Sequence, residues 1–293
     1  MIVGIDYASV DGNRPPDFNA IKAAARSAGS SVGFAILRGA WGTSPDDTIG
    51  RDWKRASDAG IVCGAYLYLR LPKGGYKESA EDQVHVFADV VGALTDRNLV
   101  PTIDVEDSGL PAQVELDFVR RAWESMRSIY GVPPMIYTSN RVWVEDLKNL
   151  PAGDMVDSPL WLAKPWPWVV HAPAVLSGDP FKGGKYDPTV PQSWGPKNWW
   201  IHQYQGDARP VPGFSNTVDL SRFNLMRQGE TGARVAWVQR RLGMIADGQF
   251  SAAMATRVKA FQVQSHLDAD AVIGPKTFAA ISWCAGVEHP RAA

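Results

Sequence analysis

The chain has 293 residues, of which 45% are hydrophobic and 21% are charged, which is typical of a soluble globular protein. One hydrophobic core rarely extends beyond about 250–300 residues, so we expect one large domain and one small domain. The net charge of -1 argues against a general nucleic-acid-binding protein. Two cysteines so far apart in the chain, Cys63 and Cys284, do not indicate a disulfide framework.

Strand-like and helix-like segments alternate through the first two thirds of the chain. Strands are predicted at residues 1–5, 33–37, 61–69, 100–104, 134–138, 160–163, 199–204 and 218–220. Helices are predicted at residues 18–28, 48–59, 78–94, 111–130 and 142–147, with Asp17 capping the first and Gly60 ending the second. This alternation favours a parallel sheet, and so many units indicate an α/β fold, an irregular (β/α) TIM-like barrel with reduced C-terminal helices.

The stretch from Val100 to Asp107 places two acids at the end of an apolar strand. Asp104 and Glu106 are two residues apart, so in a strand their side chains point to the same face. Two carboxyl groups held together push their pKa values apart, which suits acid-assisted glycoside hydrolysis. Taken alone, the pair could also be a solvated exit from a strand. Asp6 and Asp219 also fall at or near strand ends, and four acids at one barrel rim indicate a catalytic site.

The C-terminal part contains an internal repeat with a shift of 23 residues. Gln239 aligns with Gln262, and Asp247 aligns with Asp270. Each half has a helical pattern followed by a turn that contains an aspartate, and neither half can bury its apolar face alone. We therefore expect a small helical domain at residues 228–285 and a larger domain at residues 1–224, with residues 225–232 as the junction.

Both parts resemble known families. The first resembles the glycoside hydrolase family 25 muramidases, the Chalaropsis-type lysozymes. The matching segments are Gly4–Asp6, Ala59–Tyr66, Ile103–Glu106, Ile136–Thr138, Leu160–Ala163, Gln203–Tyr204 and Val218–Leu220. The second, from about residue 228 to 282, resembles the common three-helix peptidoglycan-binding module. Its matching positions include Gly232, Val235, Gln239, Leu242, Asp247–Phe250, Phe261–Gln262 and Ile273–Gly274.

The resemblance implies hydrolysis of the β-1,4 bond between N-acetylmuramic acid and N-acetylglucosamine in peptidoglycan. It implies that Glu106 is the general acid and that Asp104 either orients the N-acetyl group of the substrate or stabilises positive charge. Asp6 and Asp219 complete the ring of carboxyl groups. The implied substrate-binding residues are Tyr66, Tyr137, Trp161 and Gln203, of which the two tyrosines line the sugar next to the cleaved bond. No cofactor and no metal are expected.

Several segments depart from the family pattern. Residues 71–77 are richer in glycine and lysine than the family suggests, and residues 165–186 form an irregular insertion with several tryptophans. Both affect the expected shape of the substrate groove. In the C-terminal module, Ser251 and Ala271 stand where glycine is usual, so we expect tight or strained turns there. Of the 12 tryptophans, more than half are expected in the core.

Two other functions remain open at this stage. A zinc amidase or peptidase would need metal ligands, but none of the five histidines pair at ligand spacing, and Cys63 lies in an apolar strand where a reactive thiolate is costly. The other alternative is a barrel that binds cell-wall glycan without cleaving it.

The sequence also suggests where the protein acts. The N-terminus reaches Asp6 without a basic region, so no signal peptide is visible, and no apolar run is long enough for membrane insertion. We expect a monomeric phage endolysin that accumulates in the host cytoplasm and reaches the wall after the membrane is permeabilised. Removal of residues 226–293 is expected to leave cleavage of soluble glycan intact and to weaken binding to sacculi.

Overall fold

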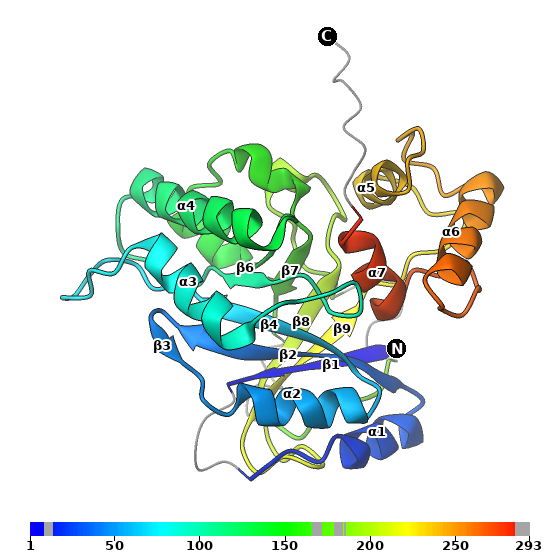
Figure 1. Cartoon of the computed structure of the whole chain (residues 1–293), viewed down its shortest axis with the longest axis horizontal. Coiled ribbons are helices and arrows are strands. Elements are labelled where there is room, and N and C mark those ends of the chain that lie inside the picture. The colour runs from blue at the N-terminus through cyan, green and yellow to red at the C-terminus, as the bar shows by residue number, and fades with distance from the viewer. Residues whose placement is uncertain (9–13, 166–171, 179–183, 185, 285–293) are drawn as a thin grey trace.

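The computed structural model describes residues 1–8, 14–165, 172–178, 184 and 186–284. Eight strands close into a barrel in the order β1-β2-β4-β5-β6-β7-β8-β9, with β9 pairing back onto β1 (Figure 1). A short strand, β3, extends the sheet beside β2. The strands are β1 Ile2–Tyr7, β2 Ser31–Trp41, β3 Ser44–Pro45, β4 Val62–Tyr68, β5 Thr102–Asp104, β6 Met135–Ser139, β7 Leu160–Ala163, β8 Ile201–Ala208 and β9 Val218–Phe223. The eight barrel strands correspond to the eight predicted ones.

The last strand differs from the expected all-parallel barrel. β9 runs antiparallel to both β8 and β1, whereas the other neighbouring barrel strands are parallel. A parallel connection needs a long crossover, usually a helix, and no helix lies between β8 and β9 among the described residues. Reversal of the strand brings its first residues, including Asp219, to the rim where the parallel strands end.

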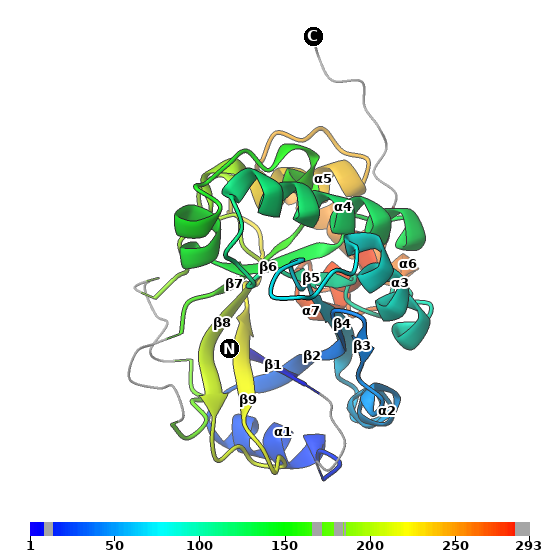
Figure 2. The same cartoon turned by 90° about the vertical axis from the view of Figure 1, so that its left-hand side faces the viewer.

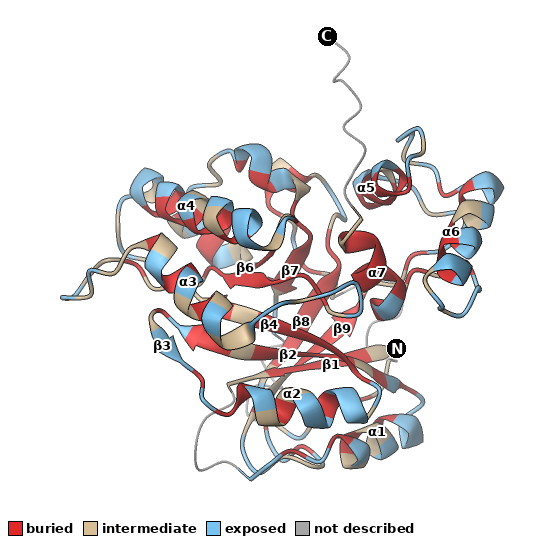
Figure 3. Ribbon diagram, viewed as in Figure 1, coloured by how far each residue is buried: buried red, intermediate tan, exposed pale blue. Residues whose placement is uncertain are grey.

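Helices pack on the outer surface of the barrel, and their buried faces point to the strands (Figure 3). They are α1 Phe18–Ser27, α2 Ile49–Asp58, α3 Ala80–Val91 and α4 Ala112–Tyr130, followed by a π-helical turn at Arg141–Asp146 and 3₁₀ turns at Gly153–Asp157 and Gln192–Trp194. Helices α1 and α2 lie on one flank of the barrel, and α3 and α4 lie on another (Figure 3). The Asp17 side chain caps α1 by accepting from the backbone N–H groups of Asn19 and Ala20, as predicted. Gly60, just after α2, has φ +73°, which also agrees with the prediction.

The three C-terminal helices reproduce the repeat in their hydrogen bonds. They are α5 Ala233–Arg241, α6 Ala252–Gln264 and α7 Pro275–Ser282. Gln239 Nε2 donates to Asp247 Oδ1 at 2.6 Å, and the equivalent Gln262 Nε2 donates to Asp270 Oδ1 at 2.9 Å. Each glutamine also accepts a backbone N–H from the turn. The same hydrogen-bonded turn therefore occurs twice, 23 residues apart as the sequence repeat predicts.

The two positions where glycine is usual behave differently. Ala271 has φ +61°, in the left-handed region that alanine disfavours, so the expected strain is present there. Ser251 has φ -76° and ψ 175°, and its side chain accepts from the backbone N–H of Met254. The expectation of strain at Ser251 is wrong, because this residue is an ordinary helix N-cap.

The helical module lies against the base of the barrel, where the parallel strands begin (Figures 1 and 2). Phe278 of α7 lies 4.5 Å from Trp200 and 5.6 Å from Phe223 between ring centroids. Trp237 of α5 lies 5.3 Å from Trp200 and donates its indole N–H to the carbonyl of Asp157 at 2.8 Å. Module and barrel therefore share one hydrophobic cluster, and the contact between them lies at the end opposite the acid-bearing rim.

The tryptophans are mostly internal. Seven of the 12 are buried: Trp123, Trp143, Trp161, Trp194, Trp199, Trp200 and Trp237. This confirms that more than half belong to the core. Much of the predicted insertion at residues 165–186 lies outside the described residues, as does residue 285 at the end of the predicted small domain. Within the described ranges, no helix is both long and apolar enough to cross a bilayer.

Candidate active site

Four acids meet at one rim of the barrel: three lie in strands, and the fourth follows the end of one of these strands. Asp6 of β1 pairs in register with Asp219 of β9, and Asp104 is the last residue of β5. Glu106 lies beyond the end of β5, but the pairing continues, since the Val105 N–H donates to the carbonyl of Tyr137 at 2.9 Å. The chain therefore stays extended, and the predicted same-face placement of Asp104 and Glu106 follows from backbone geometry.

The Gln203 side chain joins three of the predicted site residues. Its Nε2 donates to Asp6 Oδ1 at 2.7 Å and to Asp219 Oδ2 at 3.2 Å. Its Oε1 accepts from the Tyr137 hydroxyl at 2.8 Å. While the two acids are ionised they only accept hydrogen bonds, so the amide presents its NH₂ group to them and its oxygen to Tyr137. Gln203 was predicted as a substrate-binding residue, and the structure gives it a bridging position inside the site.

This arrangement determines how Tyr137 meets the candidate proton donor. The phenol has one proton, and its closer acceptor is Gln203 Oε1. Glu106 Oε1 lies 3.4 Å from the same phenolic oxygen. In this contact the Tyr137 hydroxyl donates and Glu106 accepts, over a longer distance than the bond to Gln203. The bond from Tyr137 therefore favours the ionised form of Glu106, whereas burial favours the protonated form that a general acid needs.

Burial is the main reason that the pKa values of all four acids are raised. The pKa of Asp219 rises to about 7, chiefly through burial. The pKa of Asp104 lies well above its ordinary value because of burial, with the charges of Glu106 and Asp6 adding to the rise. Burial also raises the pKa of Glu106, opposed by Tyr137 and Arg141. Because the Tyr137 hydroxyl lies closer to Gln203 than to Glu106, we expect the opposition from Tyr137 to be weak.

Asp104 is the least satisfied of the four. Its side chain is 4% exposed, and its Oδ1 has no hydrogen-bond partner among the described residues. The positive charge of Arg38 lowers the pKa of Asp104, but Arg38 is itself held by Asp46 through two bonds at 2.9 and 3.1 Å. A buried carboxyl oxygen without a donor is costly, so this atom is available for a donor on a ligand.

The raised pKa of Asp104 predicts a stabilising Asp104→Asn substitution at high pH. A carboxyl group with a higher pKa in the folded chain makes the fold lose stability as the pH rises from its ordinary value near 3.8 toward the raised value. Asparagine does not titrate. We therefore expect equal melting temperatures at pH 3 and a higher one for the variant at pH 8, with about 1.4 kcal/mol gained per unit of raised pKa.

Thermal unfolding at both pH values tests this expectation. The matched control is Asp268→Asn, at an exposed position of the small domain, which should show no such pH-dependent gain. A variant that is less stable than the parent chain at pH 8 would contradict the burial of an uncompensated charge.

Aromatic side chains form the remainder of the predicted site. The rings of Tyr137 and Trp161 are 4.4 Å apart, and those of Tyr66 and Trp161 are 6.3 Å apart. Trp161 is only 2% exposed, and its indole N–H donates to Ser221 at 3.0 Å. Trp161 thus supports the two tyrosines from within the barrel. All eight predicted site residues therefore lie in one cluster, while their separate roles remain predictions.

Sequence reasoning missed two members of the cluster. Ser221 Oγ lies 3.3 Å from Asp6 Oδ2 and connects Trp161 to the acids. Its position two residues after Asp219, on the same face of β9, was the signal that could have identified it. Arg38 stands at the end of the predicted second strand, next to the catalytic rim, and the same strand-end rule would have selected it.

A zinc amidase or peptidase would need a set of metal ligands, and a cysteine peptidase would need a reactive thiol. Among the described residues, no cluster of three or more His, Cys, Asp or Glu side chains is placed to hold a metal ion. His202 is fully buried, accepts from Arg222 at its Nδ1, and has a pKa lowered to about 3 by burial. Burial raises the pKa of the Cys63 thiol to about 12, which makes this thiol a poor nucleophile.

A closed barrel with clustered carboxyl groups at the C-terminal ends of its strands defines the class of carboxylate-based hydrolases. Residues 5–213 match the family described as "Glycosyl hydrolases family 25", and the chain belongs to this family. Residues 231–281 match a "Putative peptidoglycan binding domain". The protein is thus a glycoside hydrolase that has peptidoglycan as its partner, a peptidoglycan hydrolase.

Solved structures share this fold. A bacterial lysozyme from Streptomyces coelicolor is 24% identical, with a TM-score of 0.57 over 76% of this chain and 92% of its own. A muramidase from Acremonium alcalophilum is 21% identical, with a TM-score of 0.56 over 76% of this chain and 94% of its own. A family GH25 lysozyme from Aspergillus fumigatus is 20% identical, with a TM-score of 0.55 over 76% and 93%. No curated protein matches the chain.

Proposed function

We propose that the enzyme is a muramidase that cleaves the β-1,4 bond between N-acetylmuramic acid and N-acetylglucosamine, with Glu106 as the proton donor. The observation that carries this proposal is the hydrogen-bonded cluster of Glu106, Tyr137, Gln203, Asp6 and Asp219 at the barrel rim. The similar structures from Streptomyces coelicolor and Acremonium alcalophilum are named as a lysozyme and a muramidase, which supports the same bond.

Glu106 suits the role of the acid because it combines a raised pKa with access to solvent. Asp6 and Asp104 are each 4% exposed, whereas Glu106 is only half-buried. As the glycosidic bond breaks, the leaving oxygen takes the proton of Glu106. The ionised carboxylate then lies beside the Tyr137 hydroxyl, whose proton can turn from Gln203 toward it.

Asp104 would act on the sugar that is left with positive character. Its unpaired Oδ1 can accept the N–H of the acetamido group and so orient the acetyl oxygen toward the anomeric carbon. Alternatively, its charge stabilises the oxocarbenium-like transition state directly. Asp6 and Asp219 keep further negative charge at the same rim, and Tyr66 and Tyr137 line this sugar.

Mass spectrometry of the fragments released from purified sacculi tests the proposed bond. After borohydride reduction, we expect every new reducing end to be reduced muramic acid, because hydrolysis leaves the hemiacetal on the muramic acid residue. Reduced glucosamine ends would identify a glucosaminidase, and new free amines would identify an amidase or peptidase. Either result would overturn the proposal.

The biological setting is also proposed. The enzyme would act as a monomeric phage endolysin, which accumulates in the host cytoplasm and reaches the wall after the membrane is permeabilised. The combination of a hydrolase with a peptidoglycan-binding module supports this role, since the module would retain released enzyme on the wall. Expression in a host bacterium should cause lysis only when a membrane-permeabilising agent is added, and light scattering should give a mass near 32.0 kDa. Lysis without the agent, or a larger mass, would contradict the respective proposal.

A further inference from the structure

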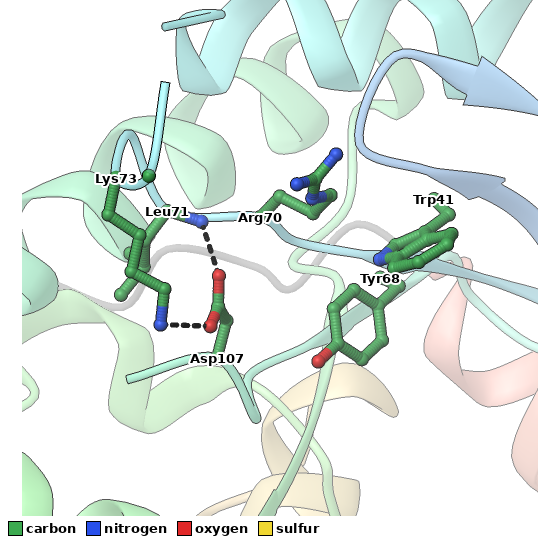
Figure 4. A pocket seen from close by; sticks show the side chains of 7 residues that line it. Trp41, Tyr68, Arg70, Leu71, Lys73 and Asp107 are labelled. Atoms are coloured by element: carbon green, nitrogen blue, oxygen red, sulfur yellow. Dashed lines mark hydrogen bonds and ion pairs between the residues drawn. The ribbon is translucent and has the colours of Figure 1, made fainter. Parts of the chain in front are cut away.

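A cavity of about 400 Å³ opens beside the candidate active site, and we call it the Arg70 pocket. Its walls include Trp41, Tyr68, Arg70, Leu71, Lys73 and Asp107 (Figure 4). Tyr68 pairs in register with Asp104, and Asp107 directly follows Glu106. The glycine- and lysine-rich segment at residues 71–77, which departs from the family pattern, supplies part of one wall.

Arg70 is the charged group of the pocket that has no ion pair. Its guanidinium carbon lies 5.2 Å from the centroid of the Trp41 ring and 4.0 Å from that of Tyr76. Among the described residues, it makes no salt bridge and no side-chain hydrogen bond. Stacking on aromatic rings leaves the planar edge of a guanidinium free for a carboxylate, which it binds through two parallel N–H bonds.

The surroundings hold Arg70 in place. Its backbone N–H donates to Gln83 Oε1 at 2.9 Å, and its carbonyl accepts from Gln83 Nε2 at 2.8 Å. Gln83 is fully buried in α3. The Tyr76 hydroxyl accepts from the backbone N–H of Thr43 at 3.0 Å, which fixes the second ring. An anion would therefore meet a cation that is already positioned, so little ordering entropy opposes binding.

The charges of the pocket leave an excess of one positive charge. Lys73 pairs with Asp107 at 2.5 Å, and its ammonium group also donates to the carbonyl of Ser108. The other Asp107 oxygen accepts from the backbone N–H of Leu71 at 2.9 Å. Lys73 and Asp107 therefore neutralise each other, and the charge of Arg70 remains uncompensated.

We propose that the Arg70 pocket binds a carboxylate carried on the lactyl substituent of a muramic acid residue. The inference rests on the proposed function, since the pocket adjoins the acids that cleave the glycan. Two sources offer this group: the stem peptide attached to the lactyl group, and the lactyl carboxylate itself where the peptide is absent. Trp41, which is 47% exposed, and Leu71 provide apolar walls for the methyl groups beside these carboxylates.

Steady-state kinetics of Arg70→Gln on three soluble glycans test the proposal. The first carries stem peptides, the second has been stripped of peptides by an amidase, and the third is the first with its carboxylates converted to methylamides. Loss of a charge-assisted pair should raise KM about 10- to 100-fold with kcat nearly unchanged. We expect this increase in KM on at least one of the two carboxylate-bearing glycans and none on the amidated glycan. Arg70→Lys should restore part of the lost affinity.

The two carboxylate-bearing glycans distinguish the sources. An increase confined to peptide-bearing glycan assigns the pocket to the stem peptide, and one confined to stripped glycan assigns it to the lactyl carboxylate. The matched control is Arg127→Gln, because Arg127 also stacks on an aromatic ring, 5.2 Å from Trp123, but lies exposed on α4. An unchanged KM, or an equal increase on the amidated glycan, would overturn the proposal.

Failure of the proposed function would be recognised separately. If the parent enzyme releases no reducing muramic acid ends from any of the three glycans, the muramidase assignment is wrong, whatever the Arg70 variants do. The melting temperatures of the variants show whether a raised KM reflects misfolding. Arg70→Lys is a further check, because it keeps the charge and most of the side chain.

Discussion

Replacing Glu106 with Gln is expected to lower kcat on peptidoglycan by about 10²- to 10⁴-fold, the range that a general acid contributes. Glutamine has nearly the same shape and keeps an oxygen that can accept from Tyr137, but its amide has no acidic proton to give to the leaving oxygen. Binding of the glycan should change little, because the substitution leaves the shape of the groove intact. Loss of turbidity of purified sacculi, followed by counting of new reducing ends, measures the effect.

The fold of this variant should be intact or more stable than that of the parent chain. Burial raises the pKa of Glu106, so the ionised group lowers the stability of the fold at neutral pH, and we expect its removal not to cost stability there. Glu124→Gln is the matched control, since it makes the same chemical change at an exposed position of α4. Parental rates in Glu106→Gln, with an unchanged melting curve, would exclude Glu106 as the acid.

Much of the site could be predicted because its residues lie at the ends of regular strands. A strand has a period of two residues, so the sequence alone places Asp104 and Glu106 on one face, and barrel topology brings Asp6 to the same rim. Asp219 arrives there for a different reason, the reversed direction of β9. Direction is not encoded in the pattern of a single short strand, and the sequence therefore predicted its place but not its orientation.

The hydrogen-bond network could not be predicted, because it depends on side chains from strands far apart in the chain. Gln203 and Asp6 are 197 residues apart, yet their bond of 2.7 Å helps to determine which way the Gln203 amide points. The amide orientation then decides where the Tyr137 proton goes. The resemblance to the family marked Gln203 and Tyr137 as substrate-binding residues, but only the three-dimensional contacts connect them to the protonation of Glu106.

The second large effect is expected when residues 226–293 are removed. The sequence suggested a wall-targeting module that can be deleted without loss of cleavage. The structure changes this expectation, because the module covers the base of the barrel and shares its hydrophobic cluster. Trp200 and Phe223, which are 1% and 5% exposed in the full chain, would lose the partners that cover them.

The energies indicate the size of the effect. Burial of one large apolar side chain is worth about 1.5–3 kcal/mol, and folded chains have a net stability of only about 5–15 kcal/mol. The deletion also removes polar contacts across the interface. Among them are the bond from Arg234 to the carbonyl of Asn224 at 2.8 Å and the pair of Arg241 with Asp157 at 3.2 Å. We therefore expect the shortened chain to aggregate or to melt far below the full chain.

A point substitution separates this structural role from targeting. Phe278→Ala should cost about 3–5 kcal/mol, since the ring is fully buried between module and barrel. The full chain should melt in one transition if the two parts unfold together. Ile245→Ala is the matched control, because Ile245 is 87% exposed on the module and its loss should leave the melting temperature unchanged.

The same cluster connects the interface to the catalytic rim. It includes Tyr137 and Trp161 of the candidate site together with Phe278 of the module. Loss of packing at the base should therefore also disturb Tyr137 and Trp161. We expect it to lower cleavage even of soluble glycan, which needs no wall-binding module. Activity of the shortened chain equal to that of the full chain, with an unchanged melting temperature, would show that the barrel is complete without its module.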